Sequence, residues 1–370
     1  MPMKITAVRA VVLQLPVRHK SYLGVGSLEK VENVLVTIET NAGITGYGEA
    51  SPWPCFADNA WSIKAAIDHY LGPALIGEDP ADIERLLLHM DAVLHDYSFA
   101  KAALDIALWD IAGKAVGKPV YALLGGKVRD CTTLSYSIAN QDIDKDLAEI
   151  KWLMDQGFFV FKIKAGVLDL GAEIPRIEAI RRLLPPPFDM RIDFNQGLER
   201  ELAIKTCRAL EPYAPTFMEQ PVKGWDIAAM AAITAAIDTP IMADESVFSI
   251  QNALEVVKQQ AADLASIKLM KPGGITRSRK AAAVFEAAGM ACYAGAMWES
   301  GIGIAASLHF TAATPNVRYG SDFYIPNFLL EDDLILEPLK MQAGYIYVPE
   351  APGLGVEIDW SAVERYTCKA

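Results

Sequence analysis

The chain has 370 residues, 52% of them hydrophobic, which is enough to bury one large core or the cores of two domains. Its formal net charge of −12 argues against nucleic-acid binding, because no excess of basic residues offsets repulsion from phosphate. Five scattered cysteines without a C-x-x-C motif favour reduced thiols. Since no apolar run of membrane-spanning length or signal-peptide pattern is present, we expect a soluble cytoplasmic protein that binds neither nucleic acid nor membrane.

The first third of the chain has the pattern of an α+β domain. Residues 3–40 alternate apolar and polar side chains and are rich in β-branched residues, which predicts antiparallel strands. The sequence Asn-Ala-Gly at 41–43 predicts the turn into a further strand. From about Asn59 to Val116 apolar residues recur at helical spacing, and the segment FAKAALDIALWDIAGKAVG ends in a glycine. We therefore assign residues 1–125 to an α+β domain.

After Gly125 and Gly126 short apolar strands alternate with helical runs at intervals of roughly 25 residues, as in barrels of the (β/α)₈ type. Eight strands are predicted, at 133–139, 159–165, 190–195, 216–221, 240–246, 265–271, 290–296 and 317–322. We place the barrel in residues 126–330 and a C-terminal segment in 331–370. A doubly wound open sheet is the alternative, which the absence of a G-x-G-x-x-G motif after an early strand disfavours.

Asp193, Glu219 and Asp244 end three consecutive predicted strands, at intervals of 26 and 25 residues. In a barrel these strand ends open on one face, where active sites lie. Converging carboxylates repel one another unless a cation lies between them, and oxygen ligands favour Mg²⁺. No histidine or cysteine occupies these strand ends, which argues against zinc. A helix N-cap or a surface ion pair explains any one of the acids equally well, but three in register favour a metal site.

The strand FVFKIKAG carries Lys162 and Lys164 on one face, because side chains alternate along a strand. Lys268 belongs to the sixth strand, four strands away in a ring of eight, so Lys164 and Lys268 are expected to flank a ligand. A nearby cation and partial desolvation both lower a lysine pKa, as a general base near neutral pH requires. The pattern predicts abstraction of a proton α to a carboxylate, with a metal ion holding the enediolate. A structural ion pair is the alternative for Lys162 and Lys164.

The chain resembles the enolase superfamily, in its muconate-lactonizing subgroup, over essentially its whole length. The segment AKAALDIALWDIAGKAVGKPVYALLGG resembles the end of the family's capping domain, and K-x-K, RIDFNQ, MEQP, ADES and IKLMKPGG follow the subgroup's order. The resemblance implies an α/β fold, a modified TIM barrel, (β/α)₇β, with an N-terminal α+β capping domain. It implies Lys164 and Lys268 as acid/base catalysts and Lys162 as a neighbour that lowers the pKa of Lys164 and touches the substrate carboxylate. The implied ligands of one divalent ion, Mg²⁺ or Mn²⁺, are Asp193, Glu219 and Asp244.

The same resemblance implies two mobile cap loops, near residues 19–27 and 51–59. They carry Tyr22, Trp53 and Phe56, aromatic residues able to close over a ligand and exclude water. The C-terminal segment is expected to return to the cap. Family members commonly form even-numbered homo-oligomers, so a homo-oligomer is expected here.

Three reactions are implied by the subgroup, and the lysine pair alone does not separate them: cycloisomerisation, racemisation or epimerisation, and dehydration. Glu299 and Asp322, after the seventh strand and at the end of the eighth, are candidate substrate contacts. Dipeptide epimerases carry D-x-D at the second position, whereas this chain reads Asp322-Phe323-Tyr324, which disfavours a dipeptide. Asp322 is expected to hold one amine or imine nitrogen. Trp298 either offers a cation–π face or packs in the core.

The overall resemblance is greatest to enzymes of proline derivatives, namely hydroxyproline dehydratases and proline-betaine epimerases. Dehydration of cis-3-hydroxy-L-proline is the leading expectation, because its C3 hydroxyl is β to the carboxylate. Epimerisation of a proline derivative, an amino acid or a dipeptide is the alternative. Muconate-type cycloisomerisation is less favoured, since a dianion gains nothing from Asp322, and no histidine lies at a strand end to serve mandelate-racemase-type chemistry. A non-catalytic protein would predict a broken set of key residues, and all five are present.

Overall fold

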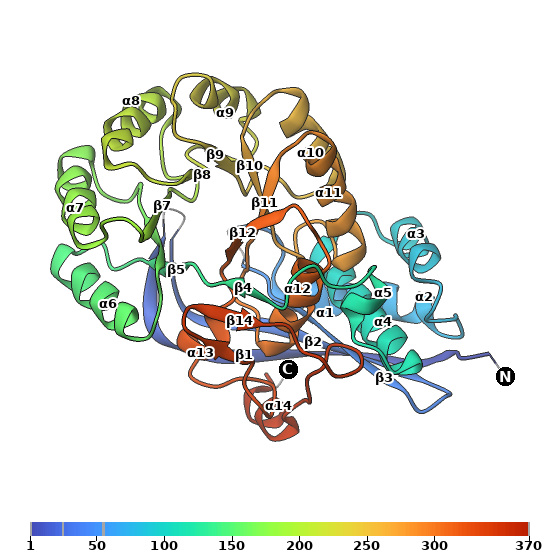
Figure 1. Cartoon of the computed structure of the whole chain (residues 1–370). Helices are drawn as coiled ribbons and strands as arrows, with labels where there is room; N and C mark the ends of the chain where they lie inside the picture. Colours follow the sequence, from blue (N-terminus) through green and yellow to red (C-terminus); the bar gives the residue numbers. More distant parts are fainter. Residues whose placement is uncertain (1, 24–25, 54–55, 369–370) are drawn as a thin grey trace.

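The computed structural model describes residues 2–23, 26–53 and 56–368, and the side chains of residues 19–29 lie outside that description. A three-stranded antiparallel sheet opens the chain, in the order β1-β2-β3 (Figure 1). Its strands are β1 (Ile5–Leu23), β2 (Gly26–Thr40) and β3 (Thr45–Ala50). The helices that follow are α1 (Ala60–Ala66), α2 (Gly72–Leu75), α3 (Ile83–Val93), α4 (Ser98–Val116) and α5 (Val120–Leu123), with a π-helical turn at Ile67–Leu71. The expected turn joins β2 to β3 at residues 41–43.

Helix α4 packs directly against β3, and two glycines permit this close approach. A Cβ atom on Gly48 would lie 1.9 Å from the carbonyl oxygen of Ala103, and one on Gly46 would lie 2.2 Å from that of Ala107. Most residues of α4 are buried, as expected for a helix that is apolar on all sides. Its other side reaches the barrel, where the Trp109 indole donates to Thr276 Oγ1 at 2.9 Å.

Eight parallel strands form the second sheet, in the order β12-β11-β10-β9-β8-β7-β6-β5. They are β5 (Tyr136–Ile138), β6 (Val160–Lys164), β7 (Asp189–Asp193), β8 (Met218–Glu219), β9 (Ile241–Ala243), β10 (Leu264–Ile267), β11 (Ala291–Ala294) and β12 (Val317–Ser321). Seven helices alternate with them and surround the sheet (Figure 1): α6 (Ile143–Asp155), α7 (Leu170–Leu183), α8 (Arg200–Leu210), α9 (Ile227–Thr234), α10 (Ile250–Lys258), α11 (Ile275–Ala287) and α12 (Gly301–Ala312). The predicted (β/α)₇β barrel is therefore confirmed.

The ring closes where the two ends of the curled sheet meet. A parallel bridge joins Leu134 to Ser321, and the Ser135 amide donates to the Ser321 carbonyl at 2.8 Å. This closing seam is irregular because the predicted strand 133–139 is split into β4 (Cys131–Thr133) and β5. β4 pairs instead with the small sheet of β13 (Met341–Gln342) and β14 (Tyr345–Tyr347).

Several barrel strands are shorter than the sequence predicted. The predicted strands 216–221, 240–246 and 265–271 end in the structure at Glu219, Ala243 and Ile267. Beyond these points the backbone leaves the ladder and turns into loops; the amide of Asp244, for example, donates to Gln220 Oε1 at 2.9 Å. Asp244 and Lys268 therefore lie just past the strands that were expected to carry them.

The last part of the chain returns to the first sheet. It contains the short helices α13 (Ile325–Phe328) and α14 (Trp360–Tyr366), and a 3₁₀ turn at Glu211–Tyr213 lies earlier, after α8. The amide of Cys368 donates to the carbonyl of Val12 on β1 at 2.9 Å. Among the described helices, none combines the length and the apolar character that crossing a membrane would require.

Candidate active site

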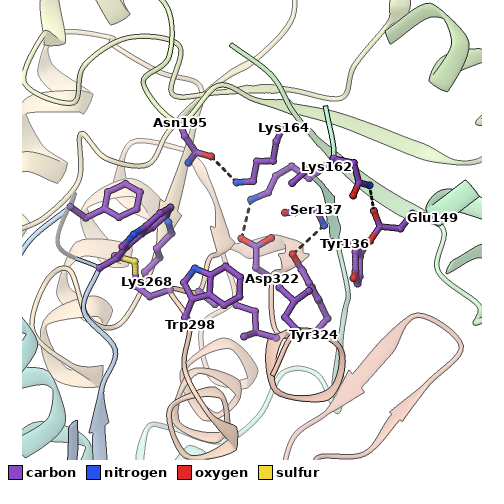
Figure 2. A pocket seen from close by; sticks show the side chains of 18 residues that line it. Tyr136, Ser137, Glu149, Lys162, Lys164, Asn195, Lys268, Trp298, Asp322 and Tyr324 are labelled. Carbon is purple, nitrogen blue, oxygen red and sulfur yellow. Dashed lines mark hydrogen bonds and ion pairs between the residues drawn. The ribbon is translucent and has the colours of Figure 1, made fainter. Parts of the chain in front are cut away.

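The carboxyl ends of the barrel strands surround a compact cavity of about 100 Å³. Figure 2 shows the charged side chains of Lys162, Lys164, Lys268 and Asp322 directed into it. Aromatic side chains complete the wall: Trp53, Phe56, Tyr136, Trp298 and Tyr324. Because β6 and β10 are four strands apart in the ring, Lys164 and Lys268 approach the cavity from opposite sides. Cationic groups therefore face one another across a largely aromatic space.

Asp193 and Glu219 are the last residues of β7 and β8 and are register partners in the sheet. Asp244 directly follows β9. All three carboxyl groups are almost completely buried. Burial, together with the charge of Asp193, raises the pKa of Glu219 well above its ordinary value. Burial also acts to raise the pKa of Asp244, but two neighbouring lysines outweigh it and hold that pKa below its ordinary value. The structure thus brings the three acids together on adjacent strands.

Lys164 is the last residue of β6 and the register partner of Asp193 on β7. Its Nζ atom donates to Asp193 Oδ2 at 2.5 Å and to Asn195 Oδ1 at 2.9 Å. Asn195 in turn donates from Nδ2 to Glu245 Oε1 at 3.1 Å. Since the Lys164 side chain also lines the cavity, two polar side chains fix the ammonium group at its edge.

Lys162 lies deeper, two residues earlier on the same strand face, and is almost completely buried. Its Nζ atom lies 3.0 Å from Glu219 Oε2 and 2.9 Å from Asp322 Oδ2, and 5.0 Å from the centre of the Tyr293 ring. Burial acts to lower the pKa of Lys162, but the charges of Asp322 and Glu219 outweigh it and raise that pKa well above its ordinary value. The contacts of Lys162 are therefore those of the structural ion pair that the sequence left open.

Lys268 and Lys271 share one acid. Lys268 Nζ donates to Asp244 Oδ2 at 2.7 Å, while Lys271 Nζ donates to Asp244 Oδ1 at 2.5 Å and to its carbonyl at 2.6 Å. Burial acts to lower the pKa of Lys268, but Asp244, Glu245 and Glu219 outweigh it and raise that pKa. The sequence predicted a lowered lysine pKa. The direction differs here because the expected cation is replaced in this set of charges by carboxylates that stabilise the ammonium form.

The three acids have the right donor chemistry for a hard divalent ion. Their donors are oxygen atoms only, and Glu219 Oε1 is buried without a hydrogen-bond partner. As the side chains lie, each acid is bonded to a lysine. Accordingly, within residues 2–23, 26–53 and 56–368 no three His, Cys, Asp or Glu side chains are arranged as a metal centre. The residue types fit Mg²⁺, and their present positions are those of lysine-paired acids.

The structure separates the other predicted substrate contacts. Trp298 and Phe56 line the cavity, and Trp298 is also packed, with 7% of its surface exposed. Asp322 lines the cavity too, but Lys162 and the Tyr293 hydroxyl, at 2.6 Å from Oδ1, occupy its two oxygens. Glu299 is fully buried behind the wall, where Oε2 accepts from the amide of Met297 at 2.7 Å and burial raises its pKa to about 8. The Tyr22 side chain lies outside the described residues.

Sequence reasoning missed several residues that belong to this cavity or support it. Asn195 follows Asp193 by two positions, so it lies on the same side of the chain, and this spacing was a usable signal. Glu149 on α6 lines the cavity and accepts from Asn140 Nδ2 at 2.6 Å. Tyr136 and Tyr324 stack with ring centres 4.3 Å apart across the closing seam. No local pattern pointed to these last contacts, because they depend on how the ring closes.

Comparison with known proteins agrees with this architecture. Residues 5–125 match the family described as the N-terminal domain of mandelate racemase / muconate lactonizing enzyme, and residues 145–362 match the enolase C-terminal domain-like family. The chain belongs to the enolase superfamily. Within it, the chain carries both the N-terminal and the C-terminal domain of the mandelate racemase/muconate lactonizing enzyme group.

Superfamily members with different reactions are similar to the chain along its full length. It is 32% identical to muconate cycloisomerase 1 from Rhodococcus opacus, over 99% of each chain. It is 36% identical to L-Ala-D/L-Glu epimerase from Bacillus subtilis, over 96% of this chain and 97% of that one. The crystal structure of N-succinyl Arg/Lys racemase from Bacillus cereus superposes with a TM-score of 0.95 at 33% identity, over 99% and 98% of the two chains. Isomerases with three different substrates are thus similarly related to it.

Proposed function

We propose that this superfamily member removes the proton α to the carboxylate of a small amino or imino acid, and that it dehydrates cis-3-hydroxy-L-proline or a similar hydroxylated imino acid. One observation carries the proposal. Lys164 and Lys268 line a single cavity from strands four places apart in the ring, so a ligand between them meets a lysine on each face. Two lysines in this arrangement provide a general base and a general acid.

The stereochemistry of cis-3-hydroxy-L-proline suits a two-sided arrangement. Its hydroxyl lies on the same ring face as the carboxylate, so the α-proton lies on the opposite face. One lysine takes the α-proton, and the other protonates the departing hydroxyl. The Cα–H and C3–O bonds break, a Cα–C3 double bond forms and water leaves. The enamine product then tautomerises to Δ¹-pyrroline-2-carboxylate. The trans isomer carries both groups on one face and would leave the second lysine without a role.

Asp193, Glu219 and Asp244 would hold a divalent ion, Mg²⁺ or Mn²⁺, which supplies positive charge to the substrate carboxylate as its acidity rises. The chain's own residues orient the proton carriers, since Asp193 and Asn195 bind Lys164 and Asp244 binds Lys268. Aromatic side chains exclude water, and a cationic ring nitrogen would find favourable faces on Trp298 and Tyr324. We assign the role of a cap over this cavity to residues 1–125, which contribute Trp53 and Phe56.

Epimerisation of a proline derivative is the second candidate. It uses the same two lysines, one to remove the α-proton and the other to return a proton to the opposite face. The similarity to an epimerase and a racemase favours it. Muconate-type cycloisomerisation is less favoured despite the similarity to a cycloisomerase, because the cavity presents the acids Asp322 and Glu149 alongside its lysines.

One assay separates these reactions. Purified protein with Mg²⁺ is incubated in D₂O with cis-3-hydroxy-L-proline, trans-3-hydroxy-L-proline and N-methylated prolines, and NMR follows α-deuteration, epimer formation and pyrroline formation. We expect pyrroline from the cis isomer and much less from the trans isomer. Lys164→Ala and Lys268→Ala should each abolish dehydration. Inversion without water loss would favour epimerisation, and the absence of α-exchange from every imino acid would reject the proposed substrate class.

A further inference from the structure

The loop of residues 297–300, between β11 and α12, supplies part of the cavity wall and is held by the first part of the chain. Met297 and Trp298 line the cavity. Ser300, at the end of the loop, caps the N-terminus of α12, with Oγ accepting from the amide of Ile302 at 3.3 Å. The position of Trp298 therefore depends on what fixes these four residues.

Glu49 on β3 binds the end of this loop. Its carboxylate accepts from the Ser300 amide at 3.0 Å, from Ser300 Oγ at 2.8 Å and from the amide of Gly303 at 2.9 Å. Glu49 is fully buried, and burial raises its pKa to about 7. Such a group is costly to bury unless donors surround it, and here a helix N-terminus and two side chains supply them.

Two more residues of the first sheet region bind Trp298 itself. Asn33 on β2 donates from Nδ2 to the Trp298 carbonyl at 2.9 Å and to Glu49 Oε1 at 2.7 Å. Ser51 Oγ accepts from the Trp298 amide at 3.1 Å. Both backbone polar groups of Trp298 are thus bound by side chains from the other end of the sequence, and Asn33 and Ser51 are fully buried.

Close packing prevents the loop from adjusting by sliding. A Cβ atom on Gly303 would lie 2.7 Å from Cβ of Glu299 and 2.9 Å from Glu49 Oε2, so helix α12 begins in direct contact with both acids. A change at Glu49 therefore moves the start of α12 and the loop together, rather than being absorbed by empty space.

We propose that Asn33, Glu49 and Ser51 are positioning residues, through which the first part of the chain sets where Met297 and Trp298 stand in the cavity and thereby which substrates fit. This rests on the proposed function in so far as the cavity is the place where substrate binds. None of the three residues needs to touch substrate. Their effect is on the shape of the wall, and errors of about 1 Å in such a wall have large effects on turnover.

The first test does not depend on any substrate. Hydrogen–deuterium exchange is compared for wild type, Glu49→Gln and a matched control, Asp110→Asn. Asp110 is also a buried carboxylate of the first part of the chain and also accepts backbone amides, those of Tyr47 and Leu354, but it holds the C-terminal segment and not the cavity wall. Faster exchange at residues 297–303 is expected in Glu49→Gln only, and at residues near 354 in Asp110→Asn only. Unchanged exchange at 297–303 in Glu49→Gln overturns the proposal.

The second test measures selection among substrates. With any imino acid that the wild type turns over, Glu49→Gln is expected to raise KM about tenfold with a smaller change in kcat, and to reduce the preference between cis and trans isomers. Asp110→Asn should lower Tm while leaving KM and the preference unchanged. Ser51→Ala removes one acceptor and serves if Glu49→Gln does not fold. Equal KM values in wild type and the loop variants reject the proposal, whereas failure of the wild type to act on imino acids rejects only the proposed function.

Discussion

Lys162 on β6 and Asp322, directly after β12, form a buried ion pair with 2.9 Å between Nζ and Oδ2, across the seam at which β5 closes the ring (Figure 2). Asp322 was expected to hold a substrate nitrogen. In the structure it instead neutralises a lysine that also lies 3.0 Å from Glu219. The pair therefore couples the closure of the barrel to the acids at its centre.

A double-mutant cycle on this pair should show strong coupling. Lys162→Met or Asp322→Asn alone leaves a buried charge without its partner, which costs about 3–5 kcal/mol of unfolding free energy. The double variant should be destabilised by much less than the sum of the two. Urea unfolding of all four proteins measures this. The exposed pair Lys280–Glu84 is the control and should show a coupling of at most about 1 kcal/mol. Additive effects at Lys162 and Asp322 would contradict the prediction.

A divalent ion should stabilise the folded protein. Binding at Asp193, Glu219 and Asp244 would raise Tm with ion concentration, corresponding to about 2.7 kcal/mol at one hundred times Kd. Exhaustive chelation should abolish α-proton exchange, and Mg²⁺ should restore it. Differential scanning calorimetry with and without Mg²⁺ tests this, with Asp244→Asn expected to lose the Mg²⁺-dependent rise and Asp110→Asn expected to keep it. Full activity after chelation would exclude a required metal.

Much of the barrel could be predicted because its signals are local and repeat. Each strand–helix unit has nearly constant length, and the acids recur at one position of the unit, so both the ring and the adjacency of Asp193 and Glu219 follow from spacing alone. The strand ends were less predictable, since the backbone leaves the ladder early where side chains such as Gln220 compete for its amides. Periodicity does not encode that competition.

Contacts between distant segments could not be predicted in this way. No pattern indicates that Lys162 would choose Asp322 and Glu219 over a substrate carboxylate, or that Glu49 would bind Ser300. These choices depend on the twist of the closed ring and on how the first sheet packs on it. They are also the contacts that separate a residue exposed to substrate, such as Trp298, from one buried behind it, such as Glu299.

The buried imidazole of His309 should make the fold acid-sensitive. Its Nδ1 accepts from the Tyr121 amide at 3.3 Å and its Nε2 pairs with the Leu354 carbonyl at 3.0 Å, which requires the neutral ring with the proton on Nε2. Burial lowers its pKa to about 4. The unfolded chain takes up a proton near pH 6.5 and the folded chain only near pH 4, so this stability is complete above about pH 6.5 and is lost as the pH falls toward 4.

Across that range the loss attributable to His309 is on the order of 3 kcal/mol. Urea unfolding at about pH 7.5 and pH 5 should therefore show a marked decline in the wild type, and His309→Gln, which cannot titrate, should show a shallower one. His95, whose side chain is largely exposed, provides the control substitution and should leave the pH dependence unaltered. The same decline in wild type and His309→Gln would assign the acid sensitivity to other groups.

Arg176 on α7 should link stability to the position of Lys164. Its guanidinium, fully buried, lies 2.6 Å from Asp146 Oδ2 and 2.7 Å from Glu173 Oε1, and it donates to the carbonyl oxygen of Lys164 at 3.0 Å. Arg176→Met leaves two buried acids without their cation and should cost about 3–5 kcal/mol. Arg176→Lys keeps the charge but not the planar fork, so it should recover only part of that stability, because one ammonium group cannot span all three acceptors.

The same two variants should slow turnover in proportion to how far Lys164 is released. Arg176→Lys is the informative one, since it is expected to fold, and it should lower kcat for α-proton exchange more than it raises KM, because Lys164 acts in the chemical step. Unfolding free energies and exchange kinetics measured on the same samples test the link. Arg182→Lys is the matched control, because Arg182 lies on the same helix with an exposed side chain paired only to Glu178. If Arg176→Lys matched the wild type in kcat, Arg176 would be a purely structural residue, and Asp193 and Asn195 would suffice to hold the lysine.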